Sequence, residues 1–146
     1  MLTQAQIARM IPHAGRMCLL ERVLAWDATT IRCSSGSHRD PANPLRVGKD
    51  LPALCAIEYA AQAMAVHGGL CGTTAARPTA GYLASLRDVA CLQSVLDSAP
   101  GDLVVEAERL MGDEARVIYR FAVWVGQTEI MNGRATVVLD VRTANA

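Results

Sequence analysis

The chain has 146 residues, of which 51% are hydrophobic, and its 14 acidic and 14 basic side chains balance. That size and composition suit one compact domain spanning residues 1–146. No run of like charges indicates a surface for nucleic acid or an anionic membrane, so a small neutral ligand or a protein partner fits better.

The N-terminal segment and the cysteines narrow the setting further. Residues 1–17 lack the basic start and continuous apolar core of a signal peptide, and nowhere do 18 apolar residues run uninterrupted, so we expect a cytoplasmic protein. The five cysteines are an odd number without a CxxC pair, which argues against a disulfide framework and a zinc site. We expect them to be small buried side chains.

The first part of the chain predicts a short helix, two strands and a long loop. Thr3 can cap a helix that Pro12 stops. Residues 17–27 and 29–37 are rich in apolar and β-branched side chains, which predicts two strands joined by a turn. Residues 38–52 contain three prolines and little periodicity, and a loop of that length is a candidate wall of a functional site.

The next segment is rich in alanine and predicts one long central helix, from Pro52 to a stop at Gly68-Gly69. This helix is apolar nearly all round, so other structure should wrap it. One carboxylate, Glu58, nevertheless lies within it. An unpaired buried charge is costly, so either Glu58 reaches solvent through a gap or it has a specific role.

The remainder of the chain alternates between strand-like segments and turns. In one segment the alternate residues from Val117 to Val125 are apolar, which predicts a strand with a buried face. Four such strands are predicted, over residues 79–92, 102–112, 115–126 and 129–141. We expect them to form an antiparallel meander and the chain to form an α+β domain whose sheet wraps around the helix.

The start of the central helix combines two groups that chemistry beside a carbonyl requires. The first free N–H groups, at Ala53 and Leu54, carry the positive end of the helix dipole and can hold a developing oxyanion. Glu58 lies one and a half turns further on and can transfer a proton. Gln62 lies one turn beyond Glu58 on the same face, so we expect it to contact substrate.

Several motifs resemble the bacterial 3-hydroxyacyl-ACP dehydratases of the hotdog fold. LPALCAIEYAAQA at 51–63 resembles their central helix, where Phe-Pro-Gly precedes Glu and Ala-x-Ala-Gln. IPHAGRMCLLERV at 11–23 resembles their Leu-Pro-His-Arg and Leu-Leu-x-Asp-Arg-Val opening, and Pro100-Gly101-Asp102 matches a turn between later strands. The variants PHAGRM, NPLR and LPA are most similar to dehydratase-like proteins encoded with aryl-polyene biosynthesis.

The resemblance implies a hotdog fold, in which an antiparallel sheet wraps around one long central helix, and a dimer with a shared sheet. It also implies an active site at the dimer interface, built from a histidine of one chain and the helix carboxylate of the other. The substrate would arrive on the phosphopantetheine arm of acyl carrier protein, with no metal or dissociable cofactor required. The partner chain would be a second copy or a related hotdog protein.

The chain departs from the family at the catalytic histidine. In the family this residue lies fourteen positions before the helix carboxylate, which here is Pro44, next to Asn43. Neither side chain is a base, although Asn43 can hydrogen-bond to substrate.

Three histidines are candidates for the missing base. His67 lies two and a half turns beyond the helix carboxylate and should be structural or on the surface. His38 reaches the site only if its loop folds back. His13 matches a histidine of the family and, with an ordinary pKa of about 6.5, suits proton transfer. The alternative role of His13 is to hydrogen-bond its own loop.

The leading hypothesis is dehydration of a 3-hydroxyacyl thioester on acyl carrier protein to the trans-2-enoyl thioester. His13 would take the α-proton, and Glu58 of the partner chain, kept protonated by apolar surroundings, would protonate the departing hydroxyl. The amides of Ala53 and Leu54 would polarise the carbonyl. The alternatives are an acyl-thioester hydrolase, in which Glu58 activates water, and a non-catalytic acyl-binding partner subunit.

Overall fold

The computed structural model describes residues 1–11, 15–72, 81–97, 100–113 and 115–139. Its helices and strands are β1 (Leu2–Thr3), α1 (Gln4–Ala8), β2 (Arg22–Trp26), β3 (Thr30–Ser35), α2 (Ala56–Cys71), β4 (Gly81–Cys91), β5 (Leu103–Gly112), β6 (Arg116–Val125) and β7 (Thr128–Leu139). Short 3-10 helices cover Gly15–Met17, Ser37–Arg39 and Ala53–Cys55. The predicted order of helices and strands is therefore confirmed.

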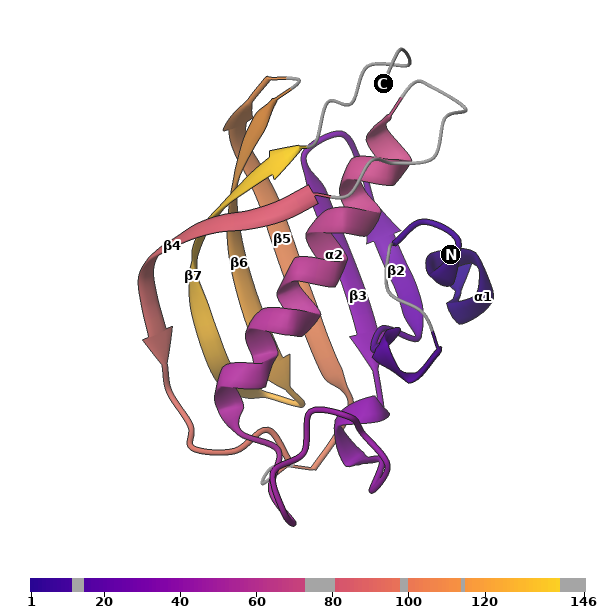
Figure 1. Cartoon of the computed structure of the whole chain (residues 1–146), viewed down its shortest axis with the longest axis vertical. Helices are drawn as coiled ribbons and strands as arrows, with labels where there is room; N and C mark the ends of the chain where they lie inside the picture. Colours follow the sequence, from indigo (N-terminus) through magenta and orange to yellow (C-terminus); the bar gives the residue numbers. More distant parts are fainter. Residues whose placement is uncertain (12–14, 73–80, 98–99, 114, 140–146) are drawn as a thin grey trace.

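The described strands form one seven-stranded antiparallel sheet in the order β1-β2-β3-β5-β6-β7-β4. Helix α2 crosses one face of this sheet and contacts β3, β5 and β6 (Figure 1). The predicted meander holds for β5, β6 and β7. It is wrong for β4, which pairs with β7 at the far edge of the sheet. Sequence patterns define a strand but not its neighbours, because pairing depends on the folded topology.

The core lies between α2 and the sheet. On β6 the five alternate residues from Val117 to Val125 are all buried, as predicted. Small side chains on the sheet-facing side of α2, including Ala56, Ala60 and Ala63, are also buried. They let the helix backbone approach the strands closely, so an alanine-rich helix suits this position.

Helix α2 starts and ends differently from the prediction. A 3-10 turn, Ala53–Cys55, precedes the α-helix, which begins only at Ala56. At the other end the helix continues through Gly68 to Cys71, where the N–H of Gly72 donates to the carbonyl of Gly68 at 3.0 Å. The expected stop at Gly68-Gly69 is therefore wrong. Glycine weakens a helix without ending it unless it adopts a left-handed cap.

The predicted long loop before α2 is fixed in place by one arginine. Arg46 donates to the backbone carbonyls of Asp40, Lys49 and His38 at 2.8, 3.1 and 2.9 Å. It also forms an ion pair with Asp97 at 2.9 Å, and both of these side chains are largely buried. A guanidinium group with several fixed acceptors holds a loop without regular secondary structure in one conformation.

All five cysteines are free, as expected, but they are not uniformly buried. Cys18 and Cys33 lie in the core, and burial raises the pKa of Cys33 to about 12. Cys55 and Cys71 are half-buried and Cys91 is exposed, which corrects the expectation for these three. In the described part of the chain, no helix is long and apolar enough to cross a membrane.

Candidate functional site

Glu58 lies in the first turn of α2 and is half-buried. Among the described residues, no hydrogen-bond or ion-pair partner approaches its carboxylate within bonding distance. In a single chain Glu58 is therefore partly open to solvent, and the helix stripe that carries it is not fully covered. Along this stripe Leu54 is 62% exposed, and Ala61 and Ala65 are half-buried.

The amides at the helix start differ in their availability. The N–H of Ala53 donates to the carbonyl of Ser94 at 3.0 Å, so it is not free to hold an oxyanion, contrary to expectation. The N–H of Leu54 has no backbone acceptor among the described residues. Of the two predicted donors, only Leu54 retains an N–H without a backbone acceptor among the described residues.

Gln62 lies one turn beyond Glu58, but its amide is occupied. Its Oε1 accepts the N–H of Leu19 at 2.9 Å, and its Nε2 donates to the carbonyl of Met17 at 2.5 Å. The side chain is fully buried. Gln62 therefore ties α2 to the segment before β2, and the predicted substrate contact would require these bonds to break.

Asn43 belongs to a buried polar network. Its Nδ2 donates to the Ser37 carbonyl at 2.9 Å and to the Tyr59 hydroxyl at 3.1 Å, and its Oδ1 accepts the N–H of Leu45 at 2.9 Å. The hydroxyls of Ser37 and Tyr59 lie 2.7 Å apart. Both ends of the Asn43 amide are hydrogen-bonded within the protein. The side chain therefore holds the loop in place and does not offer a free donor.

The same network reaches the segment that Gln62 holds. The carbonyl of Leu19 accepts the hydroxyls of Ser35 and Ser37 at 2.6 and 2.8 Å. Both the N–H and the carbonyl of Leu19 are thus bonded to side chains. The part that Tyr59 and the two serines play in this network was not predicted. The available signals were the Ser-Ser-Gly-Ser run at the end of a strand and a tyrosine among alanines.

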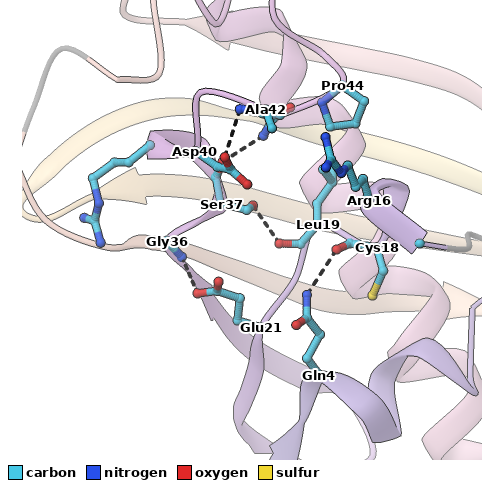
Figure 2. Close-up of a pocket in the computed structure, with 13 residues that line it drawn as sticks. Gln4, Arg16, Cys18, Leu19, Glu21, Gly36, Ser37, Asp40, Ala42 and Pro44 are labelled. Atoms are coloured by element: carbon cyan, nitrogen blue, oxygen red, sulfur yellow. Dashed lines mark hydrogen bonds between the residues drawn. The ribbon is translucent and has the colours of Figure 1, made fainter.

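A cavity of about 530 Å³ lies between residues 15–21 and the loop over residues 36–44 (Figure 2). Asn43 and Pro44 line it, together with Arg16 and other polar groups, and Glu58 does not. In Figure 2 many of these polar groups already bond to each other, as Glu21 does to the N–H of Gly36. The described cavity is therefore separate from the carboxylate.

The histidines fall into two groups. His13 lies outside the described residues, so its predicted place in the site stays a prediction. His67 is buried, with Nδ1 2.8 Å from the Tyr119 hydroxyl and Nε2 2.9 Å from the Asp27 carbonyl, which confirms a structural role. His38 is also buried, with Nε2 3.1 Å from the Gly101 carbonyl. Burial lowers the pKa of both His38 and His67, which favours their neutral forms.

Strand β4 is the edge strand of the sheet, and no described strand pairs with its outer side. The chain leaving β4 bonds to the helix start through the contact between Ser94 and Ala53. On the helix side of β4, Leu83, Leu86 and Val89 are each more than a third exposed. In a single chain the outer edge of β4 is unpaired among the described strands (Figure 1), and the stripe of α2 that carries Glu58 is partly exposed.

Comparison with known proteins identifies the family. A family model described as ApeP-like, ApeP dehydratase, matches residues 5–145. The chain belongs to this family. A search of curated protein sequences found no match.

Solved structures agree with the family and confirm the hotdog fold. The dehydratase heterocomplex ApeI:P from Xenorhabdus doucetiae is 25% identical over 93% of this chain and 91% of that chain, with a TM-score of 0.82. A thioesterase from Haemophilus influenzae is 11% identical over 100% and 96%, with a TM-score of 0.65. A mutant thioesterase from Pseudomonas aeruginosa is 13% identical over 82% and 80%, with a TM-score of 0.59. At these identities the two thioesterases show the fold alone.

Proposed function

We propose that this chain is the acid-bearing subunit of a dehydratase that removes water from a 3-hydroxyacyl thioester carried on acyl carrier protein. The observation that carries the proposal is the carboxylate of Glu58, half-buried and unpaired among the described residues, on the open side of α2. Membership of the ApeP-like dehydratase family supports the reaction class. Carboxylates placed in this way are suited to proton transfer once a partner covers them.

The active unit in this proposal is a dimer. A partner chain covers the β4 edge and the open stripe of α2, so the apolar side chains of Leu83, Leu86 and Val89 leave water. The related ApeI:P dehydratase is a heterocomplex, which supports a related hotdog chain as the partner. A second copy of this chain is the alternative.

The proposed reaction breaks the C2–H and C3–O bonds of the substrate and forms a C2=C3 double bond. A histidine takes the C2 proton, and the protonated carboxyl of Glu58 gives its proton to the C3 hydroxyl, which leaves as water. The N–H of Leu54 polarises the thioester carbonyl while the proton is removed. Transfer of the histidine proton to solvent and reprotonation of Glu58 complete the cycle.

The histidine is the component that this chain does not supply at the family's position. Asn43 and Pro44 occupy this part of the sequence instead, and the amide of Asn43 is already hydrogen-bonded within the protein. We therefore propose His13 as the base, with a histidine of a related partner chain as the alternative. Loss of a general base typically lowers the rate 10²- to 10⁴-fold, so a twofold effect of His13→Ala would favour the partner's histidine.

The test is a product assay on 3-hydroxyacyl-acyl carrier protein, using this chain alone and mixed with a related hotdog chain from the same genome. Enoyl thioester, detected by mass spectrometry, supports the proposal. Free acid would instead indicate hydrolysis, with Glu58 activating water. Unchanged substrate in both samples would contradict a catalytic role and favour an acyl-binding subunit.

A further inference from the structure

Three arginines form a row across the face of the sheet opposite α2, and the row ends at the free edge. The strand register pairs Arg120 of β6 with Arg134 of β7, and Arg134 with Arg87 of β4. Directly paired residues of antiparallel strands project from the same face. All three side chains are exposed. Arg87 is thus the end of a continuous row of positive charge.

Like charges directly opposite each other destabilise a sheet, so the row needs counter-charges. Arg120 pairs with Glu108 at 3.2 Å, and Arg134 pairs with Asp88. The bond and charge of Arg134 hold the pKa of Asp88 below its ordinary value, and Arg87 contributes less to this shift. Among the described residues of this row, two carboxylates therefore neutralise three guanidinium groups. Arg87 has only the influence of Asp88, which is already bound to Arg134.

The position of Arg87 along β4 determines what it meets in a dimer. The strand spans Gly81–Cys91, so its midpoint is Leu86, next to Arg87. If two copies paired edge to edge about a twofold axis at this midpoint, their two Arg87 side chains would be diagonal neighbours, roughly 7–8 Å apart. Long side chains interact at that distance, and the two arginine rows would join into one.

Among the described residues, β4 of a second copy offers Arg87 no free carboxylate. By register, the other residues of β4 on this face include Ser85 and Ala90, which are uncharged. Asp88 lies in the bulge between Arg87 and Ala90 and is held by Arg134. Self-pairing therefore adds positive charge without neutralising it.

We propose that Arg87 selects a related chain over a second copy as the partner at β4, by pairing with an aspartate or glutamate on the edge strand of that related chain. The inference rests on the proposed function in one respect, the assembly of the dimer through β4. Charged groups at an interface set partner choice through both attraction and repulsion. The partner is thereby defined by its chemistry, as a hotdog chain with an acidic edge strand.

The test needs only this chain and its variants. Wild-type chain is mixed with Arg87→Glu chain, and association is measured by sedimentation equilibrium at low salt. The mixture should associate about tenfold more tightly than wild type alone, because an attractive pair replaces a repulsive one. The advantage should shrink as salt is added. Arg22→Glu is the matched control, since Arg22 is an exposed arginine on β2, near the opposite edge of the sheet.

A neutral variant separates charge from folding. Arg87→Gln keeps a long polar side chain and should raise self-association severalfold over wild type. A tight wild-type dimer that is insensitive to salt and to both Arg87 substitutions would overturn the proposal, as would a mixture that associates no better than its components. Because no substrate is present, such a failure leaves the role of Glu58 untouched.

Discussion

Polar side chains only one turn apart on α2 lie in opposite conditions. Gln62 and Tyr59 are buried, and their polar atoms bond to the backbone or to other side chains. Glu58, one turn before Gln62, is half-buried and has no partner among the described residues. A satisfied buried group stabilises the fold, whereas an unpaired ionisable group beside an open surface is a candidate for chemistry. Variants at these positions should therefore separate the structural role of Gln62 from the role proposed for Glu58.

The largest loss of stability is expected at Gln62. Gln62→Leu leaves the Leu19 N–H and the Met17 carbonyl without their partner, and unsatisfied groups of this kind cost about 2–3 kcal/mol together. Urea unfolding measures the change. Gln127→Leu, at an exposed position between β6 and β7, is the control and should change the free energy of unfolding by less than about 0.5 kcal/mol. An equally small effect of Gln62→Leu would contradict the structural role given to Gln62.

Arg46 should come next, because it fixes the loop beside the helix start. Arg46→Met leaves Asp97 unpaired and three carbonyls without a donor, which should lower the free energy of unfolding by about 2 kcal/mol. The control is Arg9→Met, at an exposed position after α1. Thermal unfolding followed by circular dichroism compares the two variants, and equal melting temperatures would contradict the role given to Arg46.

A smaller effect should follow from pH. Burial holds the pKa of His38 and His67 below 6.5 in the folded chain, so the unfolded chain binds more protons as the pH falls through about 6.5. The free energy of unfolding should therefore decrease from pH 7.5 to pH 5.5. Urea titrations at both values test this, and stability that is unchanged or higher at pH 5.5 would be inconsistent with neutral buried histidines.

The sequence predicts features whose cause is local. Alternation from Val117 to Val125 identified a strand and its buried face, and an apolar alanine-rich run identified the central helix, because both signals depend on side-chain periodicity alone. Family motifs then supplied the hotdog fold. The extension of α2 past Gly68-Gly69 shows the limit of a local signal, since glycine permits a stop without requiring one.

Contacts between residues that lie far apart in the sequence could not be predicted from it. The N–H of Ala53 was expected to be free, but Ser94, more than 40 positions away, accepts it. Gln62 was expected to contact substrate, but its partners come from the segment before β2. For the same reason β4 was placed beside β5 instead of β7. Each error concerns which groups meet after folding, which periodicity and spacing do not encode.

The smallest effect on stability is expected at Glu58, where the effect on activity should be large. Glu58→Gln keeps the volume of the side chain and removes only the titrating proton, so the free energy of unfolding should stay within about 0.5 kcal/mol. Glu129→Gln is the matched control, because Glu129 is also half-buried but lies at the start of β7. The control should retain both stability and activity.

The most direct test of the role of Glu58 measures turnover and thermal unfolding of Glu58→Gln in one preparation, in the assembly that forms enoyl thioester. We expect dehydration to fall at least about 10²-fold, as for loss of a general acid, with an unchanged melting temperature. Wild-type turnover in the variant, or a large loss of stability in place of the loss of turnover, would contradict this role.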